Sequence, residues 1–370
     1  MTPYFFIYGF VAAGVSLCFL DDAPTRRVVQ NYYLILLMVA LAIFAGMRSP
    51  SVDRDFGDYV VWFDLIKAGN APLFAWLRDP AFACMSWVVA QLGFPYSVVA
   101  FLYALLGLVA TWRFAAAVSA QRWVTLLFYL LFCQYFMVLE MTEIRAAVAI
   151  PLMGLALYQA SQGKRRAAIW TYLIALVFHF SVVVALPFLV MLLAGARFRT
   201  RAWLYWMIAA GAVASVTMRS IINLLSGLYR LSEYLNGGAE QHDLRVISWY
   251  ALAHLIFILV PTVFLWKRLT RHQRMATLAC SMGLLFFVIF GWNTGLATRL
   301  LYIFDIYWLL IMMMILEVLH DNARVIYVGF LTLTGLALFW KSLTYMQPYS
   351  TLHPWDAMLH PLANLVAVHL

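Results

Sequence analysis

A short polar segment between two apolar stretches has the residue types for acid–base and phosphate chemistry. It runs from Arg48 to Tyr59 and holds five charged side chains, in a chain of which only 11% is charged. Charge beside membrane hydrocarbon is costly, and it is kept where it binds a polar substrate or forms a fixed ion-pair network. In the first case Arg48 binds an anionic group, Asp55 serves as a base or orients an arginine, and Tyr59 contacts the substrate. In the second, Asp55 pairs with Arg48 or Arg54, and Tyr59 belongs to an interfacial aromatic belt.

Further polar residues stand at the ends of later apolar runs. Glu143 and Arg145 lie at the mouth of one run. Arg145 is expected to contact phosphate, and Glu143 either holds Arg145 in place or acts as a base. His179 lies between two short apolar segments, where a broken helix commonly lines a cavity. Arg299 begins another run and Tyr302 follows one turn later, so both are candidate substrate contacts.

The longest polar loop contributes two more candidates, Arg230 and Arg245. It also contains tyrosines and a Gly-Gly pair, which suit sugar stacking and a mobile lid. A solvated loop is the alternative for both arginines. For Arg48 and Arg299 the alternative is an anchor at the lipid headgroups.

Composition indicates which elements must position these residues. Of 370 residues, 65% are hydrophobic and 16% aromatic, and the mean hydropathy is +0.86. Such a chain is predicted to be an all-α polytopic membrane protein, with residues 1–370 forming a single transmembrane domain. The first 20 residues lack a basic region before their apolar run and are expected to remain as a span. The four cysteines are isolated and predict packing, with no metal site and no cofactor.

The net charge of +9 is explained by membrane orientation, because the basic residues are spread over short loops between apolar runs. No nucleic acid partner is therefore expected. The 28 residues 167–194 are flanked by basic clusters on both sides, which predicts two short helices that turn near His179. Residues 81–92 are too few to cross and predict a re-entrant or interfacial helix. The twelve expected spans are 4–20, 31–47, 97–113, 123–139, 145–160, the two short helices within 167–194, 202–218, 246–266, 275–291, 299–318 and 325–340.

This topology places both termini, the loop 219–245 and the tail 341–370 on the outer side. Most of the 25 lysines and arginines then lie on the inner side, as positively charged loops do in membrane proteins. The candidate site residues gather at the outer face.

Several of these residues also occur in a recognisable order. They are Arg48, Val52, Asp55, Tyr59 and Phe63; Glu143-Ile-Arg145, followed by Phe178-His179-Phe180-Ser181 and Pro187; and Arg299-Leu-Leu-Tyr302 with Tyr345-Met-Gln-Pro348. Their order and spacing resemble the EpsG-type members of the Wzy-like exopolysaccharide and O-antigen polymerase family. Two departures are that Asp53 stands where the family pattern has glycine, and that one extra residue separates Arg48 from Val52.

The resemblance implies a glycosyltransferase of the bacterial inner membrane, similar in architecture to C-type glycosyltransferases. Its implied reaction joins oligosaccharide repeat units carried on undecaprenyl diphosphate, at the periplasmic face. Membrane lipid, a flippase and a chain-length regulator of the same pathway are the implied partners. Arginines 48, 145 and 299 would stabilise the lipid diphosphate, while Asp55, Glu143 or His179 takes the proton of the acceptor. Two alternatives stay open: a lipid-linked oligosaccharide flippase or other transporter, and a transferase or ligase that adds a single glycan.

Overall fold

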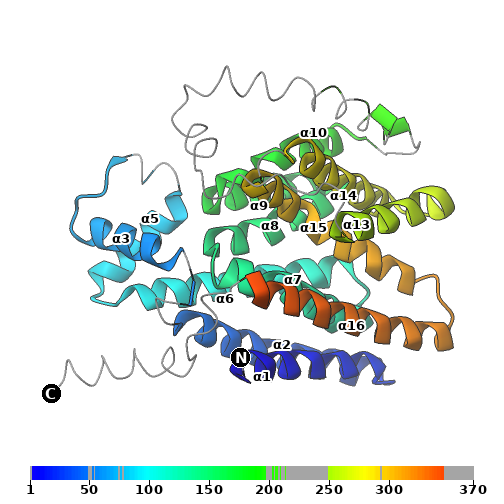
Figure 1. Ribbon diagram of the computed structural model, residues 1–370, viewed down its shortest axis with the longest axis horizontal. Coiled ribbons are helices and arrows are strands. Elements are labelled where there is room, and N and C mark those ends of the chain that lie inside the picture. The colour runs from blue at the N-terminus through cyan, green and yellow to red at the C-terminus, as the bar shows by residue number, and fades with distance from the viewer. Residues whose placement is uncertain are drawn as a thin grey trace. The chain divides into compact units, whose positions relative to one another are not determined.

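The structure is a computed structural model that describes most of the chain. The described residues are 2–48, 52–53, 55–73, 76, 79–196, 202–203, 205–206, 209, 213, 249–291 and 294–345. Within them the chain is helical and contains no strand (Figure 1). The expected outer loop 219–245, most of the expected span 202–218 and the tail beyond residue 345 lie outside this part.

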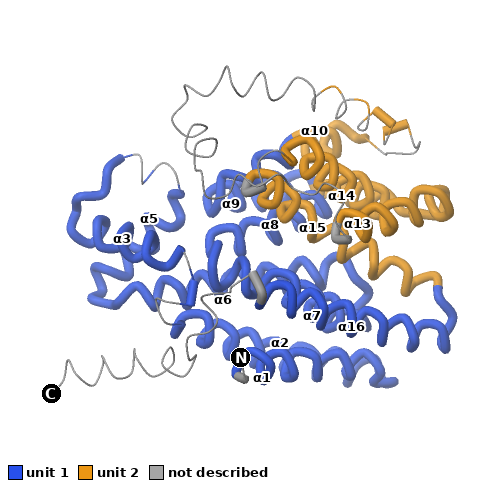
Figure 2. The backbone as a smooth tube through the Cα atoms, viewed as in Figure 1, with its two compact units in different colours: residues 1–159, 165–186, 319–370 blue, residues 160–164, 187–318 orange. Residues whose placement is uncertain are grey.

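The helices form two compact units (Figure 2). Unit 1 comprises residues 1–159, 165–186 and 319–370, and unit 2 comprises residues 160–164 and 187–318. The helical segments of unit 1 are α1 (Thr2–Ala13), η1 (Gly14–Phe19), α2 (Ala23–Gly46), α3 (Phe56–Lys67), α5 (Pro80–Gln91), α6 (Tyr96–Val118), η2 (Gln121–Trp123), α7 (Val124–Tyr135), η3 (Phe136–Glu140), α8 (Ile144–Ser161), α9 (Arg165–Phe178), η4 (Phe180–Ala185) and α16 (Asp321–Tyr345). The last residues of α8 already belong to unit 2.

Helix α7 is the central helix of unit 1. Every residue of α7 and of the π-helical segment η3 that continues it is buried. Hydrogen bonds tie α7 to its neighbours, because the Tyr129 hydroxyl donates to the Thr332 carbonyl of α16 over 2.6 Å and Ser342 donates to the Cys133 carbonyl over 3.2 Å. Position 129 thus faces 332 and 133 faces 342, so α7 and α16 run parallel.

One end of unit 1 collects basic residues. Arg122 at the start of α7 donates to the Cys18 carbonyl over 2.9 Å, and Gln30 near the start of α2 donates to the Arg122 carbonyl over 3.2 Å. The starts of α2, α7 and α16 therefore lie at the same end. Arg26, Arg27 and Arg324 stand near this end too. The opposite end holds the last turn of α2 and the short helices α3 and α5, which pack side by side (Figure 1).

Helices α8 and α9 run antiparallel, and the break after α9 falls at the expected residue. Thr171 donates to the Gln159 side chain over 3.0 Å. At His179 the backbone becomes extended (φ −157°, ψ 114°), after which η4 and α10 (Leu186–Leu193) continue the chain. The prediction of two short helices turning near His179 is confirmed. Helix α5 is a short helix of only 12 residues, as expected, and its re-entrant or interfacial placement stays a prediction.

Unit 2 is built mainly from α13 (Trp249–Val260) with its π-helical continuation η5 (Pro261–Leu265), α14 (Arg271–Ile289) and α15 (Thr294–Leu316). Helix α14 begins with a capping box, in which Thr270 and Gln273 exchange side-chain-to-backbone hydrogen bonds. Helices α14 and α15 pack along each other, with Gly283 only 2.7 Å, at its would-be Cβ, from the Phe304 Cβ. Arg271 joins the start of α14 to the carbonyls of Ser161, Leu192 and Ala196.

Seven helical stretches in the described residues are long and apolar enough to cross a membrane. They are 23–46, 96–118, 121–140, 144–161, 271–289, 296–316 and 321–343, and three shorter apolar stretches cover 3–19, 180–193 and 251–265. A helix of 24 residues extends about 36 Å, which exceeds a hydrocarbon thickness of about 30 Å. The protein is therefore a multi-pass membrane protein, and twelve spans remain a prediction.

Candidate functional site

Helix α3 presents Tyr59 to the start of α8, where Arg145 stands. The Nε atom of Arg145 donates to the Tyr59 hydroxyl over 3.3 Å. Its guanidinium carbon lies 5.3 Å from the centroid of the Tyr59 ring and 5.2 Å from that of Trp62. Two aromatic faces thus stabilise the cation while its side chain stays 16% exposed. The resulting arginine is fixed in place and only partly buried.

The counter-ion of Arg145 is Asp79, a residue that sequence reasoning did not select. Asp79 directly precedes Pro80 at the start of α5, and its side chain is only 3% exposed. One carboxylate oxygen, Oδ2, accepts from Nη1 of Arg145. Glu143 had been considered as the residue that holds Arg145 in place. The ion pair instead joins Arg145 to Asp79 at the start of α5, a helix that packs against α3 and α9. The available signal was an acid in front of a short apolar helix, and such an acid is also typical of an ordinary helix start.

Asp79 also faces His179. Its other oxygen, Oδ1, lies 3.7 Å from Nδ1 of the imidazole, whose side chain is 25% exposed. On the far side of the ring, Nε2 contacts the hydroxyl of Ser181. The extended backbone at His179 separates α9 from η4 and directs the ring toward Asp79. The Ser181 hydroxyl, the His179 imidazole and the buried Asp79 carboxylate therefore lie in a row in space. The carboxylate also binds Arg145.

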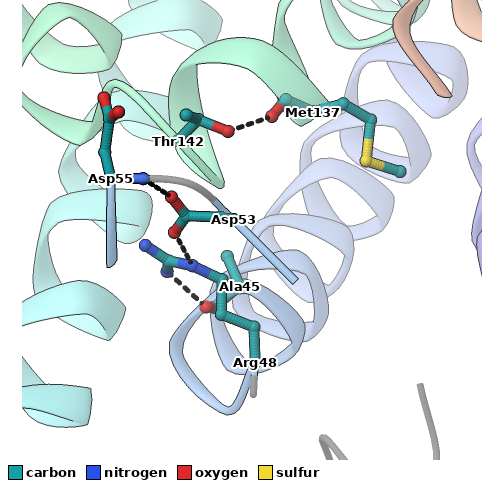
Figure 3. Close-up of polar contacts among 6 residues, drawn as sticks. All are labelled: Ala45, Arg48, Asp53, Asp55, Met137 and Thr142. Atoms are coloured by element: carbon teal, nitrogen blue, oxygen red, sulfur yellow. Dashed lines mark hydrogen bonds and ion pairs between the residues drawn. The ribbon is translucent and has the colours of Figure 1, made fainter. Parts of the chain in front are cut away.

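The last turn of α2 is closed by a buried ion pair (Figure 3). Nε of Arg48 donates to Oδ2 of Asp53 over 2.8 Å, and Nη1 donates to the Ala45 carbonyl over 2.7 Å. Oδ1 of Asp53 accepts the backbone N–H of Asp55 over 2.7 Å. The arginine thus binds an end carbonyl of α2, and the aspartate orders the entry into α3. The alternative partner considered for Arg48, Asp55, is replaced by Asp53, which stands where the family pattern has glycine.

Burial dominates the electrostatics of this pair. The side chains of Arg48 and Asp53 are 1% and 0% exposed. Burial raises the pKa of Asp53, while Arg48 acts against that rise. Burial alone would lower the pKa of Arg48, but Asp53, Tyr96 and Tyr59 together raise it above its ordinary value. Arg48 consequently stays protonated, and its contacts are those of a residue that holds the local backbone in position.

Asp55 and Glu143 both lie within electrostatic range of Tyr59. The pKa of Tyr59 is raised to about 12, mainly by burial; Arg145 acts against this rise, and Asp55 and Glu143 contribute to it. In Figure 3 the Asp55 carboxylate points away from Asp53. Tyr59 therefore stays a neutral hydroxyl, which can both accept from Arg145 and donate to a ligand.

Helix α6 adds two aromatic residues to the site that sequence reasoning missed. Tyr96 stacks on Tyr59 with ring centroids 6.4 Å apart, and Tyr103 lies two turns further on the same face, against Phe178 and Phe82. The Tyr103 hydroxyl is buried and has no hydrogen-bond partner among the described residues. The seven-residue spacing was visible in the sequence, but the same spacing is typical of ordinary packing.

Six of the ten predicted site residues come together in unit 1. They are Arg48, Asp55, Tyr59, Glu143, Arg145 and His179. Arg299 and Tyr302 lie on α15 in unit 2. Arg230 and Arg245 lie outside the described residues. Over that described part, no three His, Cys, Asp or Glu side chains are grouped as metal ligands.

Unit 2 contains a second buried ionisable pair. Nε2 of His254 on α13 lies 2.8 Å from Oδ1 of Asp305 on α15, and their side chains are 1% and 0% exposed. The imidazole stacks on Trp308 with ring centroids 4.2 Å apart. The pair links α13 to α15. Sequence reasoning did not single out His254, because a lone histidine in an apolar helix carries little signal.

Comparison with known proteins identifies the family of this chain. No curated protein and no solved structure matches the chain. The sequence model of the EpsG family matches residues 31–355, a stretch that contains every site residue described above. Because this match covers most of the chain, the protein belongs to the EpsG family.

Proposed function

We propose that this protein is a glycosyltransferase that joins oligosaccharide repeat units carried on undecaprenyl diphosphate, at the periplasmic face of the bacterial inner membrane. Membership of the EpsG family indicates a membrane polymerase of exopolysaccharide synthesis. The donor, the joined units and the side of the membrane are parts of the proposal. Twelve spans and a C-type glycosyltransferase architecture also remain predictions.

The observation that carries the proposal is the environment of Arg145. A guanidinium held by Asp79 and by two aromatic faces, at the mouth of a membrane-spanning helix, is suited to an anionic group beside the headgroups. Its forked donors match phosphate oxygens and stabilise charge without a metal. Arg48 supports the adjacent backbone, and Tyr59 offers a hydroxyl.

The proposed reaction needs a cation and a base. The acceptor hydroxyl gives its proton to the base, and its oxygen forms a bond to the anomeric carbon of the donor. The bond from that carbon to the lipid diphosphate breaks, and its electron pair leaves on a diphosphate oxygen. Arginine stabilises the negative charge that develops there. Arg299, Tyr302, Arg230 and Arg245 stay as predicted further contacts to the substrate.

The ends of the helices support the proposed sidedness. The site of unit 1 lies where α2 and α9 end and where α8 begins, opposite the end that holds Arg26, Arg27, Arg122 and Arg324. Positive residues favour the cytoplasmic side. The site would then face the periplasm.

The gathering of polar groups at one end also favours a transferase over a flippase. A transporter would need polar groups near the midplane and at both faces, related by repeats. The buried pair of His254 and Asp305 is one such group, and transport therefore stays the second candidate. A ligase that adds a single glycan would use the same site.

Mass analysis of reaction products separates these functions. Purified protein given a lipid-linked repeat unit should produce a ladder of lengths. One addition would indicate a ligase, and the absence of any covalent product would indicate a transporter.

The Arg145→Ala variant should lose the ladder while remaining folded, because the developing charge loses its cation. The matched control is Arg113→Ala, which removes an exposed arginine from the other end of α6. It should leave the ladder unchanged. A normal ladder from folded Arg145→Ala would remove Arg145 from the mechanism.

A further inference from the structure

We infer that Asp79 positions both the diphosphate-binding cation and the catalytic base, and that the base is His179. The inference rests on the proposed glycosyl transfer and deepens it. It assigns one of three candidate bases, and it adds a positioning residue that lies outside the family-like motifs. The observation is the shared carboxylate: one oxygen on Arg145 and the other toward His179.

The position of Asp79 is fixed by a rigid local frame. It lies at the start of α5, where its backbone carbonyl accepts from Ala83 over 3.1 Å, and Pro80 fixes the first helical turn. Helix α5 packs on α3, α6 and α9. A 3% exposed carboxylate in such a place needs charge partners, and Arg145 supplies one. The contact with Arg145 therefore fixes the orientation of Asp79.

The placement of Asp79 selects the useful tautomer of His179. An imidazole whose Nδ1 faces a carboxylate carries its proton there, so that Nε2 keeps its lone pair. In that tautomer the lone pair of Nε2 would accept from the Ser181 hydroxyl, which contacts this nitrogen. The serine hydroxyl occupies the direction from which an acceptor hydroxyl would approach, and a ring that is one quarter exposed is within reach of one. The 3.7 Å separation from Asp79 shortens to a hydrogen bond when the ring becomes positive, since catalytic contacts commonly tighten in the complex.

The resulting step balances. The acceptor hydroxyl displaces Ser181 at Nε2 and gives its proton to that atom. Its oxygen bonds to the anomeric carbon, and the diphosphate leaves with the electron pair of the broken bond. The imidazolium formed is stabilised by Asp79 and later returns its proton to water. Arg145, held by the same carboxylate, faces the departing phosphate. Cation and base are thus set at a fixed separation by one side chain.

Double-mutant cycles test this assignment. His179→Gln should lower kcat by about 100-fold or more, as loss of a general base does. Asp79→Asn should lower kcat by a similar factor, and the double variant Asp79→Asn/His179→Gln should lose less than the product of the two single losses, because the part that acts through His179 is lost only once. Asp79→Glu should recover part of the rate. The KM for the acceptor should change little in His179→Gln, which would separate a chemical role from a loss of binding.

A second cycle combines Asp79→Asn with Arg145→Gln and tests the contact between Asp79 and Arg145. Its losses in kcat should also be non-additive. Asp64→Asn, which changes an exposed carboxylate on α3, is the matched control and should keep the full rate. Thermal unfolding of each purified variant shows that it is folded.

Losses that add in both cycles, or an active His179→Gln protein, would overturn the inference while leaving glycosyl transfer in place. A wild-type protein that forms no glycosidic bond would overturn both the proposed function and this inference.

Discussion

Arg48 and Arg145 look alike in the sequence but have different surroundings in the structure. Arg48 is enclosed, and its contacts go to Asp53 and to the Ala45 carbonyl at the end of its own helix. Arg145 keeps part of its side chain exposed and binds a carboxylate from another helix. Both guanidiniums donate to the protein from Nε and Nη1, so the difference lies in access: the Arg48 side chain is 1% exposed and that of Arg145 is 16% exposed. We therefore propose that Arg48 supports the local backbone and that Arg145 is the arginine that binds a ligand.

At the residue scale, Asp53→Ala should destabilise the protein strongly. It leaves the guanidinium of Arg48 buried without its counter-ion, a change that costs about 3–5 kcal/mol in proteins. A clear fall in the thermal unfolding temperature in detergent is the expected reading. The double variant Arg48→Leu/Asp53→Leu should recover much of the loss, because no charge then remains buried.

Asp321→Ala provides the control for that experiment. It breaks an ion pair with Arg324 of 3.0 Å, but the Asp321 side chain is 95% exposed. Exposed pairs contribute little, so no change in unfolding temperature is expected. Equal unfolding temperatures for Asp53→Ala and the wild type would show that the buried pair does not hold the end of α2.

At the scale of elements, the site depends on where helices end. The end of α2, the start of α3, the start of α5, the start of α8 and the end of α9 each contribute one charged or aromatic group. Helix ends leave backbone groups unpaired, so polar side chains gather there at lower cost than along a lipid-facing stretch. The close packing of α2 on α6 sets the position of Arg48, which follows the last turn of α2.

A methyl group added at Gly46 should disturb that packing. Its Cβ would lie 2.6 Å from Cβ and 2.8 Å from Cα of Phe101 on α6, so the backbones must separate. Gly46→Ala should therefore cost about 1–3 kcal/mol and lower the unfolding temperature.

Gly9→Ala on α1 is the matched control, since no atom lies within 4 Å of its added methyl group. It should leave stability equal or slightly higher, because alanine favours a helix. A Gly46→Ala protein as stable as Gly9→Ala would contradict a close contact between α2 and α6.

At the scale of the whole molecule, the charge distribution predicts one orientation. In unit 1 the starts of α2, α7 and α16 lie at the basic end, and the candidate site lies at the other. The membrane potential and the insertion machinery keep lysine and arginine on the cytoplasmic side. The same orientation would bring a lipid-linked substrate in the outer leaflet to Arg145.

Cysteine labelling measures this orientation. In a Cys84→Ser background, which removes the exposed native thiol, Asp58→Cys on α3 should react with a membrane-impermeant maleimide in intact cells. Arg27→Cys, also exposed, should react only after lysis. The other three cysteines are buried and should stay unlabelled. The reverse pattern would place the site in the cytoplasm and exclude a periplasmic polymerase.

Much of the helix content could be predicted from runs of apolar residues, and two less obvious features also followed from length and charge. Residues 81–92 were expected to form a short helix, and the basic clusters around 167–194 required a turn near His179. Helix α5 is such a short helix, and the turn is confirmed at the end of α9. Helix α3 was not predicted, because its 12 residues mix charged and aromatic side chains and show no long apolar run.

The sequence alone established that this is a helical membrane protein, through its hydrophobicity, and that it belongs to the EpsG family, through the order of its motifs. It also selected the arginines and the histidine of the candidate site. Pairing was decided only by the tertiary structure. Spacing could not decide whether Asp53 or Asp55 pairs with Arg48. Asp79 is 66 positions from its partner Arg145. Local sequence determines which residues stand at helix ends. The partner of a buried charge is a residue that the tertiary packing brings within about 4 Å of it. That selection depends on how α3, α5, α6 and α9 fit together.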